Sequence, residues 1–187
     1  MPPKVKITKE DIVRTGLELV QKNGVAALNA RSVAAQLGCS TQPIFSNFTS
    51  MDGLVLAVAE KATALCNDYI QNEVSSGQYP AYKASGMAYI RFAKEEKELF
   101  KMLFMCDRKE DNTSTESELN TQMETLVHIN TGLSSESARL FHLEMWAFVH
   151  GIATMFATGF LDLSWELVSR MLSDTYLGLR KQYEMEG

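Results

Sequence analysis

Apolar residues recur at spacings of three and four along most of the chain, and no segment shows sustained alternation with period two. A three-to-four spacing places side chains on one face of an α-helix, whereas alternation is typical of a half-buried strand. The pattern therefore predicts an all-α protein of about nine helices.

Capping residues and glycines predict where the first helices begin and end. Thr8 and Asp11 have the spacing of a capping box, and Gly24 is placed to end the helix that follows. Asn29 is a good N-cap for a second helix, which Gly38 stops because glycine adopts the left-handed conformation at no steric cost. A long first helix thus precedes a shorter one and can cover its apolar back.

Residues 30–48 have the length and punctuation of two short helices around the turn at Gly38. Ser40 is predicted to cap the second of these helices, and Pro43 lies in its first turn, where backbone N–H groups lack intrahelical partners. Ile44, Phe45 and Phe48 are predicted to form its inward face. Helix, short glycine-containing turn and helix is the helix-turn-helix pattern, whose second helix enters the DNA major groove.

The rest of the chain predicts further helices without an intervening linker. A long helix restarts at Ser50 and closes at Gly77 and Pro80, so it joins the N-terminal part to the remainder. We expect helices at 81–93, 98–105, 119–129, 134–160 and 162–183, and a polar loop at 107–118. The predicted architecture is a three-helix head joined by a long helix to a helical body.

Residues 145–161 carry no formal charge and could be mistaken for a membrane span. A spanning helix needs about 20 mostly apolar residues, and this stretch is shorter. Glu144 and Asp162 flank it, and no positive cluster orients it in a bilayer. We therefore expect a helix that is buried on most of its faces.

Composition and charge fit a folded protein with one basic end. Hydrophobic residues make up 45% and charged residues 22% of the chain, and the formal net charge is −5. Residues 1–50 nevertheless carry six Lys or Arg against three acidic residues. This asymmetry is mild, but it is the one expected if only the N-terminal end meets phosphate. Three dispersed cysteines and an N-terminus without an apolar signal region favour a reducing cytoplasm.

The sequence resembles the tetracycline-repressor (TetR) family of regulators. The resemblance rests on the capped first helix, on residues 33–40 and 44–48, and on the restart at residues 50–54. Weaker similarity in the body includes Trp146, His150 and Gly151, which resemble a subgroup named for a Trp-His-Gly motif. Phe45 and Met51 stand where the family usually has tyrosine and often has lysine, so two phosphate-binding groups are missing.

The resemblance implies a DNA-binding head, residues 1–50, and an effector-binding and dimerisation domain, residues 51–187. It implies a homodimeric transcriptional regulator, usually a repressor, that binds a near-palindromic stretch of double-stranded DNA and is released by a small-molecule effector. The alternative is a small helical enzyme or ligand-sequestering protein with a vestigial head.

Candidate DNA contacts follow from the second helix of the motif. A glutamine can bond adenine N6 and N7 together, and a threonine methyl can contact thymine, so Gln42 and Thr41 are candidates for reading bases, with Ser46 beside them. Phosphate contacts are predicted for Lys9, Arg31, Ser40 and Asn47. Solvated helix surface is the alternative for each of them.

Candidate effector and dimer contacts lie in the body. An apolar pocket with a few polar groups is the usual form of such a site, and plain core packing is the alternative for each residue. Small residues four apart allow a second helix to approach closely, either in a partner or within the same chain. The effector candidates are Tyr89, Phe100, Phe104, Trp146, His150, Met155 and Phe156, and the dimer candidates are Ala147, Gly151, Leu167 and Met171.

Enzymatic chemistry finds no support in the sequence. It has no recognisable nucleophile–base pair, no phosphate-binding glycine loop and no set of metal ligands. His142 and His150 are eight residues apart, about 12 Å along a helix, which is too far for one metal ion. We therefore expect neither an enzyme nor a bound cofactor or metal.

Overall fold

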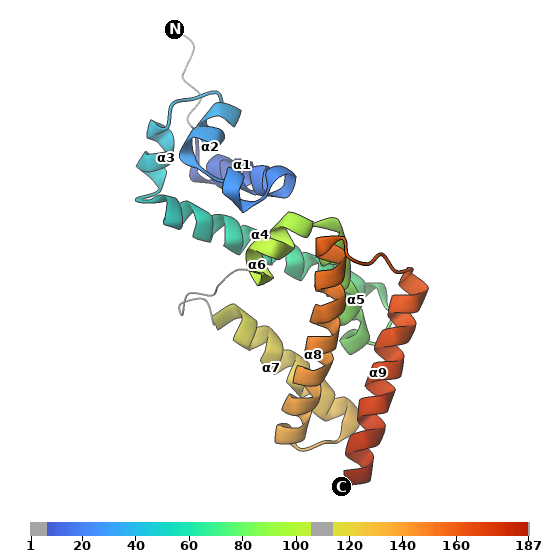
Figure 1. Ribbon diagram of the computed structural model, residues 1–187. Coiled ribbons are helices and arrows are strands. Elements are labelled where there is room, and N and C mark those ends of the chain that lie inside the picture. Colours follow the sequence, from blue (N-terminus) through green and yellow to red (C-terminus); the bar gives the residue numbers. More distant parts are fainter. Residues whose placement is uncertain (1–6, 106–113, 187) are drawn as a thin grey trace. The chain divides into compact units, whose positions relative to one another are not determined.

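The computed structural model describes residues 7–105 and 114–186, which contain nine α-helices and no strand (Figure 1). The predicted all-α fold is confirmed. By packing, the chain forms two compact units: unit 1 comprises residues 1–67 and 96–106, and unit 2 comprises residues 68–95 and 107–187. The functional division into residues 1–50 and 51–187 stays a prediction.

Unit 1 gathers the N-terminal helices around one apolar core. The core side chains Ile12, Val33, Ile44, Leu54 and Phe100 are fully buried. A short 3₁₀ turn follows α1, and α1 packs against α2, α3 and α6. The helices are α1 (Lys9–Asn23), α2 (Ala30–Gln36), α3 (Gln42–Asn47), α6 (Lys97–Phe104) and the part of α4 (Met51–Ser76) that precedes residue 68.

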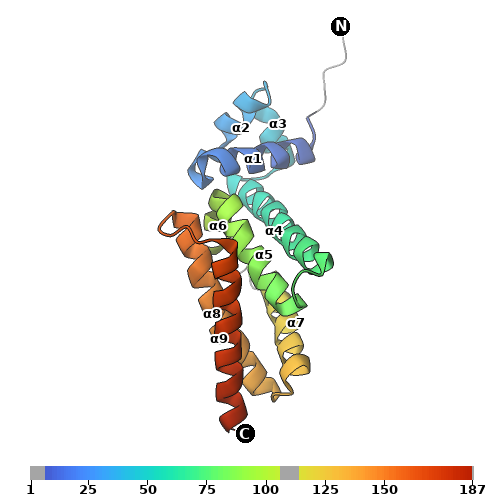
Figure 2. The same cartoon turned by 90° about the vertical axis from the view of Figure 1, so that its right-hand side faces the viewer.

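Unit 2 is a helical bundle in which α8 is the most extensively packed element. Its helices are the end of α4, α5 (Ala81–Glu95), α7 (Ser114–Thr131), α8 (Ser135–Thr158) and α9 (Trp165–Glu186). Helix α8 packs against α5, α7 and α9, and α9 also contacts α5 (Figure 2). Phe92, Phe141, Met87 and Ile90 are fully buried among these helices. The side of α8 that faces away from these helices is exposed.

Helix α8 is long and apolar enough to span a membrane, judged by its length and composition alone. The mean hydropathy of its most apolar 18-residue window is 1.2, and 44% of that window is buried inside the protein. Core helices of soluble proteins can be equally long and apolar. Its contacts with α5, α7 and α9 place one side of it in the core of unit 2. The prediction that residues 145–161 are buried on most faces holds only in part, because α8 ends at Thr158 and both Ala147 and Met155 are exposed.

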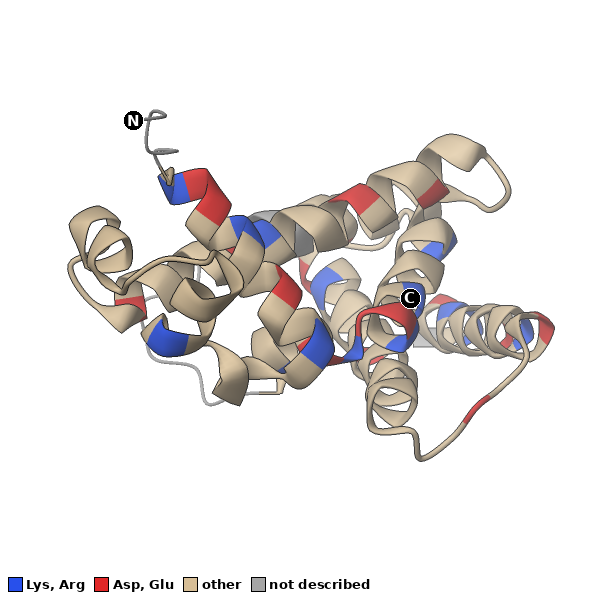
Figure 3. Cartoon of the chain, turned by 90° about the horizontal axis from the view of Figure 1, so that it is seen from above, with Lys and Arg blue, Asp and Glu red and all other residues tan. Residues whose placement is uncertain are grey.

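Charged residues of both signs are interspersed over the helices (Figure 3). Several form pairs on the surface, such as Arg14 with Asp11 in unit 1, at 2.6 Å, and Lys94 with Asp162 in unit 2, at 2.5 Å. Exposed pairs of this kind stabilise a fold by about 1 kcal/mol at most. Lys9 and Arg31 are exposed and form no ion pair within the described part of the chain.

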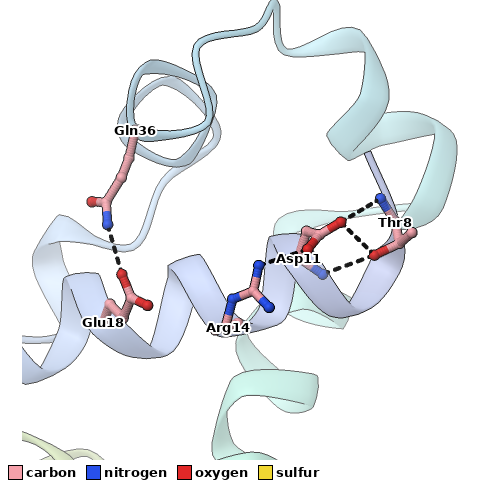
Figure 4. A network of polar contacts seen from close by, with 5 residues as sticks. All are labelled: Thr8, Asp11, Arg14, Glu18 and Gln36. Carbon is pink, nitrogen blue, oxygen red and sulfur yellow. Dashed lines mark hydrogen bonds and ion pairs between the residues drawn. The ribbon is translucent and has the colours of Figure 1, made fainter. Parts of the chain in front are cut away.

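The predicted capping box at the start of α1 is present (Figure 4). The Asp11 N–H donates to the Thr8 hydroxyl oxygen at 3.1 Å, and the Asp11 carboxylate accepts from the Thr8 N–H and hydroxyl at 3.1 and 2.6 Å. These bonds to Thr8 lower the pKa of the Asp11 carboxyl. Farther along α1, Gln36 of α2 donates to the Glu18 carboxylate at 3.1 Å.

Gly16 is required by close packing between α1 and α4 within unit 1. A Cβ at this position would lie 2.8 Å from Val58 Cγ2 and 3.0 Å from Leu28 Cδ1. Valine is branched at Cβ and has little rotamer freedom to withdraw. The absence of a side chain at position 16 therefore fixes how closely α1 approaches α4.

Three local predictions are wrong. Helix α7 begins at Ser114, so the loop expected at 107–118 is helical from there on, and residues 107–113 lie outside the described residues. Helix α9 begins at Trp165 rather than at 162, because the Ser164 hydroxyl accepts from the Leu167 N–H. Thr41, not Ser40, directly precedes α3, and it makes no side-chain capping bond.

Candidate functional site

Helices α2 and α3 are joined by a tight turn within unit 1. Gly38 follows the end of α2 with φ of 65°, a left-handed conformation that glycine adopts without strain. The Cys39 N–H then donates to the Ala34 carbonyl at 3.0 Å, which closes the turn. Val33 and Ala34 are buried, and α2 packs against α1. The predicted helix, turn and helix are thus present.

Helix α3 is anchored by Ile44 and Phe48, both of which are buried. The Lys9 ammonium lies 5.1 Å from the centre of the Phe48 ring, which ties the start of α1 to this anchor. Phe45 does not share the inward face, and this prediction is wrong: 53% of Phe45 is exposed. Ile44 and Phe48 are one turn apart, and Phe45 is rotated about 100° from Ile44 around the helix.

The outward side of α3 presents the predicted base-reading residues. Gln42 and Ser46 are exposed, and Thr41 is half-buried at the N-cap. The Ser46 hydroxyl donates to the Gln42 carbonyl at 2.9 Å, and the exposed Asn47 donates to the Pro43 carbonyl at 2.8 Å. Gln42 makes no side-chain hydrogen bond within the described part of the chain, so its amide is available for other contacts.

The predicted phosphate contacts also lie at the surface of unit 1. Lys9, Arg31 and Ser40 are exposed, and Met51 is half-buried at the start of α4. Arg31 is the only charged residue between positions 30 and 51. The segment that includes α2 and α3 therefore has no acidic group. Its positive charge is small, because Arg31 is its only basic residue.

Three of the predicted effector residues form one cluster in unit 2. The Tyr89 hydroxyl and His150 Nδ1 are 3.0 Å apart, and the Trp146 and His150 rings are stacked with their centres at 4.9 Å. All three side chains are half-buried. The cluster combines aromatic surface with polar atoms and is partly accessible.

The other effector candidates occupy different positions. Phe156 is buried and stacks on Trp165 with ring centres 5.9 Å apart, while Met155 is 38% exposed. Phe100 and Phe104 belong to α6 of unit 1, with ring centres 5.1 Å apart. The seven candidates therefore do not belong to a single unit, and their role as effector contacts stays a prediction.

The dimer candidates lie on the outer sides of α8 and α9. Ala147 is exposed, and a Cβ added at Gly151 would meet no atom within 4 Å. On α9, Leu167 is 44% exposed and Met171 is half-buried. The small residues Ala153 and Ala157, by contrast, are buried inside the protomer. Of the two small-residue pairs on α8, only Ala147 and Gly151 are therefore open to a partner.

A second tyrosine–histidine pair was not predicted from the sequence. The Tyr82 hydroxyl lies 3.0 Å from His142 Nδ1, in a core that also contains Phe141 and Tyr176. Burial raises the pKa of Tyr82 and lowers the pKa of His142. The signal was available: tyrosines seven apart on α5 and histidines eight apart on α8 each share a helix face. The two pairs hold α5 against α8.

Burial of His142 is expected to make stability depend on pH. The unfolded chain binds a proton at His142 near pH 6.5, whereas the folded chain binds it more weakly. The contribution of neutral His142 is thus complete above pH 6.5 and is lost as the pH falls toward the folded pKa, by at most about 1.4 kcal/mol per pH unit. In H142Q, the free energy of unfolding should fall less between pH 7.5 and pH 5.5, as measured by urea denaturation.

An unchanged pH dependence in H142Q would show that other groups cause it.

Metal ligands are not grouped anywhere in the residues that the structure describes: no three His, Cys, Asp or Glu side chains lie close enough to hold an ion. Cys39 and Cys66 are free thiols, and Cys106 lies outside the described residues.

Part of the sequence matches a known protein family. Residues 82–174 match the family model described as "Tetracyclin repressor-like, C-terminal domain". The chain belongs to the TetR family. The predicted membership is confirmed, and this TetR protein is thereby placed among transcriptional regulators. The Trp-His-Gly subgroup stays a prediction.

A solved structure resembles this TetR protein over nearly its whole length. It is the crystal structure of a TetR-like transcriptional regulator from Rhodococcus sp. RHA1, with a TM-score of 0.69 and 12% sequence identity. The match covers 95% of this chain and 96% of that chain. At this identity the similarity shows a common fold. No curated protein matches the sequence significantly.

Proposed function

We propose that this TetR protein is a ligand-responsive repressor that binds a near-palindromic DNA operator as a homodimer. The observation that carries the proposal is the two-sided α3: Ile44 and Phe48 anchor it in unit 1, while Gln42 and its neighbours face outward on the second helix of a helix-turn-helix. Such a helix reads base edges in the major groove, mainly through its N-terminal residues. Gln42 is the first residue of α3.

Homodimerisation is supported by an apolar stripe on the exposed side of α8. Leu140 and Leu143 are 50% and 57% exposed, and Ala147 and Gly151 continue the same face at intervals of four. Exposed apolar patches of this kind mark interaction surfaces, and a two-fold axis pairs such a patch with itself. With Leu167 of α9, the stripe would join two helices from each protomer into a four-helix bundle.

Two-fold symmetry has a consequence for the operator. Dimeric helix-turn-helix proteins place their recognition helices about 34 Å apart, the separation of successive major grooves on one side of the duplex. The two half-sites are then related by the protein's symmetry. The expected operator is therefore a near-palindrome.

Response to an effector is supported by the cluster of Tyr89, Trp146 and His150. Aromatic surface with a few polar atoms is typical of small-molecule sites. An effector bound there would favour the arrangement of the dimer that does not fit the groove spacing, in proportion to its differential affinity for the two states. We infer that the protein acts in the cytoplasm and has no catalytic activity.

Replacing Gln42 by alanine should test base reading. A bidentate glutamine–adenine contact discriminates by about 1–3 kcal/mol, so Q42A should bind the operator about tenfold or more weakly, while binding to random DNA is nearly unchanged. Fluorescence anisotropy measures both affinities. The operator duplex is selected from a random pool or taken from the DNA upstream of the gene, and duplexes of random sequence serve for comparison.

The matched control is Q122A, since Gln122 is an exposed glutamine of α7. It should bind like the wild type. An equal loss by Q42A on both kinds of DNA would contradict base reading. Absence of salt-sensitive binding to any duplex would contradict the regulator and favour a ligand-sequestering protein.

A further inference from the structure

The exposed ring of Phe45 lies on the helix that is proposed to enter the major groove. More than half of Phe45, 53%, is accessible, and within the described part of the chain its ring makes no aromatic or cation–π contact. The inward positions of α3 are filled by Ile44 and Phe48. Phe45 therefore cannot turn into the core of unit 1 without displacing a residue that anchors α3.

The neighbouring polar groups on α3 are largely engaged by their own helix. The Ser46 hydroxyl donates to the Gln42 carbonyl, and one Asn47 amide hydrogen bonds the Pro43 carbonyl. A phenyl ring has no group that can donate to a phosphate. The outward side of α3 therefore presents the unbonded amide of Gln42 and, three residues further on, the apolar ring of Phe45, with the remaining amide groups of Asn47 beside them.

Only one base offers an apolar group to such a ring in the major groove. The C5-methyl of thymine projects into that groove, whereas the other edges there are hydrogen-bond donors and acceptors. Phosphates and their bound counterions are polar and charged, so they would not bury the ring. The outward ring on a groove-entering helix consequently selects for thymine.

We propose that Phe45 contacts the C5-methyl group of a thymine in each operator half-site and is a specificity-determining residue of this protein. The proposal rests on the proposed function, because it requires α3 to enter the major groove. Together, Gln42 and Phe45 would read an adenine and a nearby thymine. Departure from the usual tyrosine at position 45 would then exchange a phosphate contact for a base contact.

Replacement of single thymines by deoxyuridine tests the contact, because it removes the methyl group and leaves base pairing unchanged. Burial of one methyl-sized group corresponds to about a fourfold change in affinity. Wild-type protein should therefore lose about fourfold in affinity when one particular thymine of a half-site is replaced. Fluorescence anisotropy on the operator selected by the wild type measures this loss.

Variants at position 45 assign the contact to its residue. F45A should bind the thymine and deoxyuridine operators equally, whereas F45L should keep part of the difference. Q42A should keep the whole difference while losing affinity for the operator. Since Phe45 is exposed, F45A is expected to fold, and circular dichroism with a thermal melt checks this.

The outcomes separate this inference from the proposed function. Operator binding that no deoxyuridine substitution weakens would overturn the methyl contact and leave the regulator intact. A methyl dependence that F45A retains would assign the contact to another side chain, such as Thr41, and would also overturn it. Failure of the wild type to bind any duplex would overturn both proposals.

Discussion

The substitution A147R is expected to split the proposed homodimer and to lower its affinity for the operator by about 100-fold or more. Ala147 lies at the centre of the exposed stripe of α8, beside Gly151, where a close-packed partner helix would leave no room for a long side chain. Burying unpaired charges there costs several kcal/mol, and a two-fold axis brings two arginines together. Loss of the second half-site removes the avidity of the dimer, which is about 10²–10⁴-fold.

Sedimentation equilibrium gives the oligomeric state, and fluorescence anisotropy gives the operator affinity. A64R is the matched control, because Ala64 is an exposed alanine of α4. It should remain dimeric and bind DNA. A dimeric A147R would place the interface elsewhere, and a monomeric wild type would contradict the dimer itself.

Replacing Phe100 by alanine should lower the free energy of unfolding by about 3–5 kcal/mol. Phe100 is fully buried in unit 1, where its ring lies against Phe104 of the same helix, and α6 packs against α1. Truncation leaves a cavity that a close-packed interior cannot fill. This loss is a large fraction of the 5–15 kcal/mol by which a typical domain is stable.

Urea denaturation measures the change, with F160A as the matched control. Phe160 is 79% exposed, so its truncation should alter stability by less than about 0.5 kcal/mol. A loss below about 1 kcal/mol for F100A would indicate that Phe100 lines an open pocket, as predicted for an effector contact. A full loss would show that its main role is structural.

The positions of most helix ends could be predicted because they depend on neighbouring residues. The capping bonds of Thr8 and Asn29 join residues three apart, and the stop at Gly38 depends on the φ angle of one residue. The start of α7 was missed for the opposite reason. Residues 114–118 are all polar and were therefore expected to form a loop, but polar residues also form helices.

The candidate DNA-binding site was only partly predictable. Exposure of Gln42 and Ser46 agrees with their predicted role, but Phe45 was placed on the wrong side of α3. In a helix of only six residues, an apolar residue next to an inward one gives no periodicity from which its direction can be read. Phe45 points outward because Ile44 and Phe48 both occupy the core of unit 1.

The sequence by itself determined the all-α fold, the N-caps of α1 and α2 and the helix-turn-helix, because each depends on contacts within a few residues. The tertiary structure decided which apolar residues are buried and which are left at the surface. Only packing distinguishes Ala147 and Gly151, which are open, from Ala153 and Ala157, which are buried on the same helix. Burial depends on which helices approach each face, and that arrangement brings together residues more than 60 positions apart, such as Tyr89 and His150.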